Sequence, residues 1–325
     1  MSKHLSRREF LQASSATAIA GAALSSFPTA AAQTQTRGPF RGTLCLFSKP
    51  VPQLNWSELG KAAKQAGFDG IDLTVRREGH VLPERAATDL PKAVAAIRAE
   101  GLEVPMITTE LKTADDPTAE PILRTASQLS IPFLKPGYFH YKFVNVVNEL
   151  NEAGRKLSGL VELAGKYGIQ VGYHNHTEYI GAVVWDMARV IEPLDPRWGG
   201  YYLDVGNLSA SCGLTESKVA INLVLPRLKM AAVKDFRWKQ VGPRQWHPIT
   251  CPVGQGFTPI REFMQALAQA NFHGPISLQQ EFIIPGVAAD QGIAISRATV
   301  PQVMESAKEG AAYLRSLLRE AYEGA

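Results

Sequence analysis

The sequence predicts an α/β protein folded as a single (β/α)₈ TIM barrel. From Gly42 onward, short apolar runs alternate with longer amphipathic segments. Three helical segments end in Gly and then enter an apolar run, at Gly67, Gly101 and Gly168. Such helix–Gly–strand junctions are typical of βαβ units in a parallel sheet, and eight alternating strand–helix units in a chain of this length favour a closed barrel. A doubly wound open sheet is the alternative, but Ser48-Lys49-Pro50 after the first strand lacks the Gly-rich phosphate loop.

The strands are predicted at the short apolar runs, which are typical of buried parallel strands. In chain order they are Thr43–Phe47, Gly70–Val75, Glu103–Thr108, Pro132–Lys135, Ile169–His174, Gly200–Asp204, Met230–Lys234 and Ile276–Glu281. The segments between them have a period near 3.6, and helix starts are marked by Asn55 with Glu58 and by Thr258-Pro259.

Four long segments follow predicted strands: Arg76–Leu90, Thr109–Pro117, Phe236–Gly256 and Phe282–Thr299. Because each starts at the carboxyl end of a strand, we expect all four at the mouth of the barrel. The third segment is rich in Trp, Gln and His. Such side chains suit a polar, ring-shaped ligand such as a sugar, although they are also common in plain lids.

The N-terminal residues 1–32 are predicted to be a twin-arginine signal peptide. Arg7-Arg8 precede an Ala-rich apolar stretch, and Ala30-Ala31-Ala32 offers a cleavage site. Residues 33–40 would form a mature tail and residues 41–325 the barrel. We therefore expect the twin-arginine translocase as an export partner, a periplasmic or secreted location and no stable membrane anchor. A disordered tail with a chance Arg pair is the alternative.

The composition is ordinary for a globular enzyme, with 45% hydrophobic and 20% charged residues. The net charge of +4 includes the basic residues of the signal segment, so it indicates no nucleic-acid partner. Cys45, Cys212 and Cys251 are too few for a disulfide scaffold. One bridge is possible, and three buried thiols are the simpler expectation.

Four apolar runs end in residues capable of chemistry: His174-Asn175-His176, Asp204, Lys234-Asp235 and Gln279-Gln280-Glu281. In a TIM barrel, side chains at the carboxyl ends of strands surround the active site. Three of these residues have a structural alternative: Glu281 an ion pair with Lys234, Asp204 a cap of the turn at Gly206-Asn207, and His174 a buried hydrogen-bonded histidine. The candidate substrate-binding residues come from these ends, from the long segments and, for His140, from the stretch after the fourth strand. They are His176, Arg76, His80, His140, Trp246 and His247.

Several strings of the chain resemble the xylose isomerase-like TIM-barrel superfamily, in the branch called sugar phosphate isomerases/epimerases. The resemblance covers about residues 41–320. The strings are Ala66-Gly67-Phe68-Asp69-Gly70-Ile71-Asp72-Leu73, Tyr173-His174-Asn175-His176, Leu203-Asp204-Val205-Gly206-Asn207, Val233-Lys234-Asp235-Phe236 and Ile276-Ser277-Leu278-Gln279-Gln280-Glu281.

The resemblance implies one divalent metal (Mn, Mg, Co or Zn) held by Glu, Asp, His and Glu side chains. Asp204 and Glu281 match two of these ligands. His174 stands where many members have Glu, and Ala232 stands where many have His. Imidazole is still a metal ligand, whereas Ala is not. The implied site is therefore His174, Asp204 and Glu281, completed by His176 or water.

The resemblance also implies an isomerase or epimerase that moves a proton next to the carbonyl of a sugar or keto-sugar. Of the two Glu bases of the family only Glu281 remains, so His174 or His176 would act opposite it, with Lys234 as a cation near substrate oxygens. A related lyase or dehydratase stays open, as does a non-catalytic carbohydrate-binding barrel. A DNA-repair endonuclease would need more metal ligands than this chain has.

Overall fold

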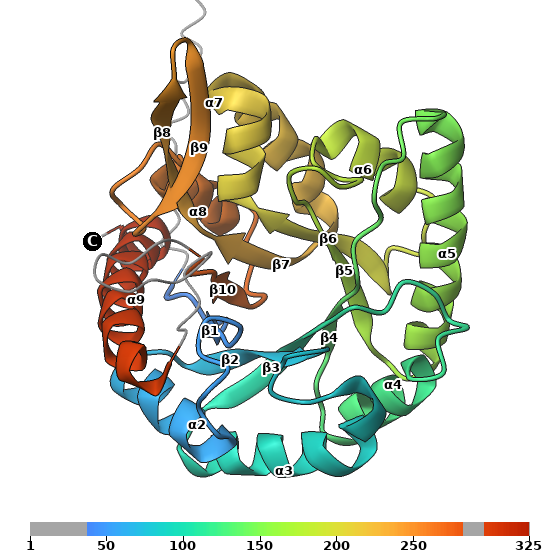
Figure 1. The fold of residues 1–325 in the computed structure, drawn as a ribbon, viewed down its shortest axis with the longest axis vertical. Coiled ribbons are helices and arrows are strands. Elements are labelled where there is room, and N and C mark those ends of the chain that lie inside the picture. Colours follow the sequence, from blue (N-terminus) through green and yellow to red (C-terminus); the bar gives the residue numbers. More distant parts are fainter. Residues whose placement is uncertain (1–37, 282–295, 325) are drawn as a thin grey trace, which may run out of the picture. The chain divides into compact units, whose positions relative to one another are not determined.

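The computed structural model describes residues 38–281 and 296–324, and the strands of its main sheet close into a barrel in which all neighbours are parallel (Figure 1). Around the barrel the order is β1-β10-β7-β6-β5-β4-β3-β2. Its strands are β1 (Leu44–Phe47), β2 (Gly70–Val75), β3 (Glu103–Thr109), β4 (Phe133–Lys135), β5 (Gln170–His174), β6 (Gly199–Asp204), β7 (Leu228–Val233) and β10 (Ile276–Leu278). The predicted (β/α)₈ TIM barrel is thereby confirmed.

The helices form a ring outside the strands (Figure 1). They are α2 (Trp56–Gln65), η1 (Pro83–Arg85), α3 (Ala86–Ala99), α4 (Ala119–Gln128), α5 (Val146–Lys166), α6 (Val184–Ile191), α7 (Val205–Val224), η2 (Leu225–Arg227), α8 (Ile260–Gln269), η4 (Arg297–Thr299) and α9 (Val300–Glu323). Asn55 and Glu58 form the predicted capping box of α2. Gly67, Gly101 and Gly168 have φ of 87°, 74° and 70°, the left-handed conformation that ends a helix before each strand.

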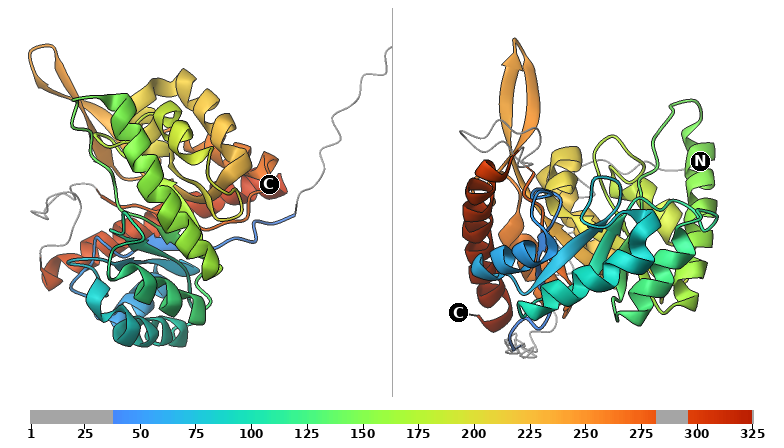
Figure 2. Two further views of the ribbon diagram at one scale, coloured as in Figure 1. Left: turned by 90° about the vertical axis from the view of Figure 1, so that its right-hand side faces the viewer. Right: turned by 60° about the horizontal axis from the view of Figure 1, so that its bottom comes forward.

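The predicted strands agree with the structure to within two residues, except at β10. This strand ends at Leu278, three residues earlier than predicted, so Glu281 follows the strand instead of ending it. The segment 236–256, predicted as a loop, mostly forms an antiparallel hairpin of β8 (Asp235–Gly242) and β9 (Gln245–Cys251) that projects from the barrel (Figure 2). Its side chains are largely exposed on both faces, so it lacks the alternation of apolar and polar residues that would have predicted strands.

The interior of the barrel contains a polar network and, beside it, a small apolar cluster. The buried Asp72 carboxylate accepts hydrogen bonds from Thr108 Oγ1 (2.6 Å), Ser277 Oγ (2.8 Å) and Tyr202 OH (3.1 Å). The apolar cluster consists of Met106, Tyr202, Met230 and Ala232, with Phe133 packed against it. Tyr202 thus belongs to both groups.

Three predicted segments lie wholly or partly outside the described part of the chain. The signal peptide (1–32), residues 33–37 of the tail and most of the segment 282–299 lie there, so the domain boundaries stay a prediction.

The helices that the structure describes include none with the length and apolar character needed to cross a membrane. Cys45, Cys212 and Cys251 are all described and are free thiols, two of them buried.

Candidate active site

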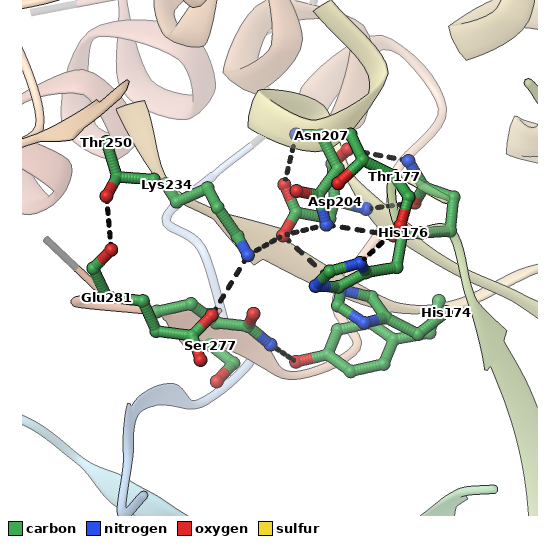
Figure 3. A network of polar contacts seen from close by, with 12 residues as sticks. His174, His176, Thr177, Asp204, Asn207, Lys234, Thr250, Ser277 and Glu281 are labelled. Atoms are coloured by element: carbon green, nitrogen blue, oxygen red, sulfur yellow. Dashed lines mark hydrogen bonds and ion pairs between the residues drawn. The ribbon is translucent and has the colours of Figure 1, made fainter. Parts of the chain in front are cut away.

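Four predicted side chains come together at the mouth of the barrel, from the ends of four neighbouring strands. His174 ends β5, Asp204 ends β6, Lys234 follows β7 and Glu281 follows β10 (Figure 3). These strands are adjacent in the order β10-β7-β6-β5. The carboxyl ends of parallel strands meet at one end of a barrel, which explains why residues far apart in sequence form one cluster.

Lys234 lies at the centre of this cluster. Its Nζ is 3.2 Å from Asp204 Oδ2 and 3.0 Å from Glu281 Oε2 (Figure 3). Burial alone would lower the pKa of Lys234, but the two carboxylates outweigh it and raise this pKa. Glu281 also pairs with Lys49, which follows β1. Although burial would raise the pKa of Glu281, Lys234 and Lys49 together hold it well below its usual range.

Asp204 is completely buried, and hydrogen bonds hold both its side chain and its backbone. Its Oδ1 accepts from the backbone N–H of Asn207 at 2.8 Å, which caps the start of α7. The Asn175 side chain accepts from the backbone N–H of Asp204 at 2.7 Å and donates to its carbonyl at 3.0 Å. Asp204 is therefore both a cap, as the structural alternative proposed, and a member of the cluster, and the Asn175 side chain holds its backbone.

His174 joins the cluster to a group of aromatic rings. Its Nε2 lies 3.4 Å from Asp204 Oδ2, and its Nδ1 is 2.5 Å from the Tyr138 hydroxyl. Burial lowers the pKa of His174 to about 4, although Asp204 opposes this shift, so the imidazole is neutral at pH 7. The His176 ring lies 5.0 Å from that of Tyr138, and burial lowers its pKa as well.

The metal that the family resemblance implies does not fit the present arrangement of donors. Lys234 Nζ lies against both Asp204 and Glu281, which are the two ligands that match the family. Ala232 supplies no donor, and it packs in the apolar cluster. No set of three or more His, Cys, Asp or Glu among residues 38–281 and 296–324 is arranged to hold a metal ion.

The predicted substrate-binding residues divide into two groups. Arg76 and His80, together with Lys49, line a hollow of about 90 Å³ next to the cluster. His140 is exposed and lines a different hollow, above α5. Trp246 and His247 are exposed on β9, because their segment forms a projecting hairpin instead of folding over the mouth. The structure thus brings Arg76, His80 and His176 near the cluster, whereas the other three lie away from it.

Sequence reasoning missed Lys49, Tyr138 and Lys135. Lys135 ends β4, which is four places from β10 in either direction around the barrel, and therefore opposite Glu281. Its Nζ lies 3.5 Å from the centre of the Tyr138 ring, and burial, with help from Arg76, lowers its pKa to about 7. All three follow or end strands, so the rule that located His174 could also have found them.

Comparison with known proteins agrees with this architecture. The family model described as xylose isomerase-like TIM barrel matches residues 61–316, and the chain belongs to this family. No protein of curated function matches the sequence.

Three solved structures of low sequence identity share the fold. A xylose isomerase-like TIM barrel protein from Mycobacterium smegmatis in complex with magnesium has a TM-score of 0.65 at 15% identity, covering 86% of this chain and 98% of that one. D-psicose 3-epimerase from Clostridium cellulolyticum H10, with D-tagatose, has a TM-score of 0.64 at 10% identity, and the match covers 85% of this chain and 99% of that one. The 3-keto-D-glucoside 4-epimerase of E. coli has a TM-score of 0.61 at 15% identity, with the same coverage of 85% and 99%.

Proposed function

We propose that this chain is an isomerase- or epimerase-type enzyme that moves a proton next to the carbonyl of a sugar or keto-sugar. The observation that carries the proposal is the cluster of Asp204, Lys234 and Glu281, with His174, at the carboxyl ends of neighbouring strands. Family membership supports it, since sugar epimerases are among the solved structures with this fold.

The reaction would start when a base takes the proton from the carbon beside the carbonyl. The electron pair of that C–H bond moves to the carbonyl oxygen and gives an enediolate, whose negative charge the Lys234 ammonium group stabilises. Return of the proton to the other face of the same carbon inverts that carbon. Return to the former carbonyl carbon isomerises the sugar, provided that the hydroxyl proton of the adjacent carbon moves to the former carbonyl oxygen. The base contributes roughly 10²–10⁴-fold.

Two groups on opposite sides of the mouth can exchange this proton. Glu281 remains ionised and partly accessible, with its side chain 13% exposed, whereas Asp204 is fully buried. The two ammonium groups make Glu281 a weak base, so it would act only on an acidic carbon. Across the barrel, Lys135 has a pKa of about 7, so part of its amine is unprotonated at neutral pH and can accept a proton. His174 belongs to the same cluster as Glu281, and with a pKa of about 4 it is the weaker base.

A proton-exchange experiment tests this proposal. The full chain is incubated with a panel of ketoses and 3-keto-sugars in D₂O, and deuterium at the carbon next to the carbonyl is followed by NMR. We expect exchange in the wild type and a loss of about 10²-fold or more in Glu281→Gln. Glu320→Gln is the matched control, because Glu320 pairs with Arg261 on the outer helices. Absence of exchange and of product with the whole panel would refute the proposal.

A non-catalytic sugar-binding barrel is the second candidate, and the double pairing of Glu281 with Lys49 and Lys234 favours it. Sugars that raise the melting temperature of the wild type without exchange or turnover would support this binder. A lyase or dehydratase would instead release water or an alcohol after the same proton removal, and NMR of the products separates it from an epimerase.

We also propose that the protein is exported to the periplasm or beyond by the twin-arginine translocase. The proposal is supported by Arg7-Arg8 and the Ala30-Ala31-Ala32 site. Replacing both Arg7 and Arg8 with Lys should retain the precursor in the cytoplasm, as judged by fractionation.

A further inference from the structure

We propose that the Lys234 ammonium group is the resident cation of this site, in the position that a divalent metal would take, and that the chain binds no such metal there. The role of this ammonium toward a sugar oxygen rests on the proposed function. The absence of metal binding does not, and it can be measured without a substrate.

The first argument is the space between the two acidic side chains. Lys234 Nζ contacts Asp204 Oδ2 at 3.2 Å and Glu281 Oε2 at 3.0 Å (Figure 3). A divalent metal bound to the same two oxygens would lie at about 2.0–2.6 Å from each of them. The metal and the ammonium group would therefore compete for one position, and only one cation can hold both carboxylates.

The second argument is the charge of the cluster. Asp204 and Glu281 contribute two negative charges, and Lys234 and Lys49 contribute two positive charges. The cluster is therefore neutral as it stands. A divalent ion would add two charges in a place where the side chains of Asp204 and Lys234 are 0% and 6% exposed. Buried charge without compensation is strongly unfavourable, so metal binding would require a lysine to leave.

The third argument is the wall of the barrel below Lys234. Ala232 precedes Lys234 by two residues, and because side chains alternate along a strand it faces the same side. There it packs against the apolar cluster with Met106, Met230 and Tyr202. This position therefore has an apolar environment and no ligand atom that could complete a metal shell.

The hydrogen-bonding capacity of lysine explains what an ammonium group in place of a metal ion would achieve. An ammonium group has three N–H donors, and within the described part of the chain Asp204 and Glu281 take two of them. The third can donate to the oxygen of a sugar carbonyl. Unlike a metal, it offers both a positive charge and a transferable proton to the developing enediolate.

Metal content provides the first test. The full chain is purified without chelator from medium containing Mn²⁺ and Co²⁺, analysed by mass spectrometry of its metals, and titrated with Co²⁺ by calorimetry. We expect no stoichiometric metal in the wild type and no change of its melting temperature with EDTA. In Lys234→Met, which frees Asp204 and leaves Glu281 paired with Lys49 alone, we expect Co²⁺ to displace Lys49, bind and raise the melting temperature.

Controls keep this test decisive. Lys229→Met removes a lysine near the start of β7, at the opposite end from Lys234. There Lys229 Nζ donates to Gln170 Oε1 at 2.8 Å, and this variant should gain no Co²⁺ site. Lys234→Arg keeps the charge and covers the case in which Lys234→Met does not fold. One equivalent of metal in the wild type, with a lower melting temperature after EDTA, would overturn the inference.

Proton exchange on a sugar substrate provides the second test. Exchange by the wild type should persist unchanged in EDTA and fall by roughly 10²–10³-fold in Lys234→Met, the usual effect of losing one donor to an oxyanion. Exchange that EDTA abolishes and Mn²⁺ restores would overturn the inference while leaving the proposed function intact. Failure of all exchange refutes the proposed function, and the metal analysis still decides the inference.

Discussion

Asp72 should make the stability of the barrel depend on pH between about 4 and 6. The side chain is completely buried, and burial raises its pKa from 3.8 to about 6, although hydrogen bonds from Thr108, Ser277 and Tyr202 oppose this shift. In the unfolded chain the carboxyl group ionises near pH 3.8. Because the pKa is raised in the folded state, the stability that Asp72 contributes is fully present below pH 3.8. It is lost as the pH rises through 6.

The size of this effect follows from the shift. A change from 3.8 to about 6 is about 2 pKa units, which corresponds to roughly 3 kcal/mol. Asp72→Asn removes the ionisation and keeps the shape of the side chain. The hydrogen bonds of the introduced Asn side chain differ from those of Asp72, but they change the free energy of unfolding by an amount that does not depend on pH. The free energy of unfolding of Asp72→Asn, minus that of the wild type, should therefore increase by roughly 2 kcal/mol between pH 4 and pH 7.5, because at pH 4 the unfolded chain is already partly ionised.

Urea unfolding of both proteins at a series of pH values measures this difference. The other titrating groups are the same in the two proteins, so their contributions cancel in the difference. Asp89→Asn is a control of opposite sign, because the hydrogen bond from Arg85 lowers the pKa of Asp89. The contribution of Asp89 is present above its unfolded pKa and is lost as the pH falls. If the difference in free energy of unfolding between Asp72→Asn and the wild type is constant from pH 4 to 7.5, the Asp72 carboxyl group is not desolvated.

Three further predictions concern the cluster and its supports. Asn175→Ala should lower the free energy of unfolding by roughly 1–3 kcal/mol in urea, because it leaves the buried backbone N–H of Asp204 unpaired, whereas Asn222→Ala on the exposed side of α7 should change little. If Lys135 is the second base, kcat/KM for a keto-sugar should rise as the pH passes about 7, and Lys135→Met should abolish that rise. Asp235→Ala should speed amide hydrogen exchange in β8 and β9, because the Asp235 carboxylate accepts from the backbone N–H groups of Gly254, Gly256 and Thr258 at 2.8–3.0 Å.

The barrel and the four central residues could be predicted from the sequence because they depend on local patterns. Apolar runs, helix-ending Gly residues and polar strand ends are all visible within short windows, and the topology of a parallel barrel then brings the strand ends together. His174, Asp204, Lys234 and Glu281 were found in this way. Their order around the mouth follows from the strand order, and so it required no knowledge of distant contacts.

The features that escaped prediction depend on contacts across the barrel. Asp72 is one polar residue in an apolar strand, and its partners come from three other strands. Lys135 is opposite Glu281 only because the sheet closes. The β8–β9 hairpin escaped for another reason, since Trp238 and Trp246 are both exposed and its strands bury no continuous face.

Two departures from the family pattern both weaken the binding of a divalent metal at this site. With His174 in place of the Glu that the resemblance implies, the cluster loses one negative charge. With Ala232 in place of the implied His, it loses one ligand. Either change alone would leave three family ligands and a reason to bind a metal. Together they leave two carboxylates, Asp204 and Glu281, whose charge Lys234 and Lys49 already balance. The same substitutions that weaken a metal site thus make an ammonium group sufficient in its place.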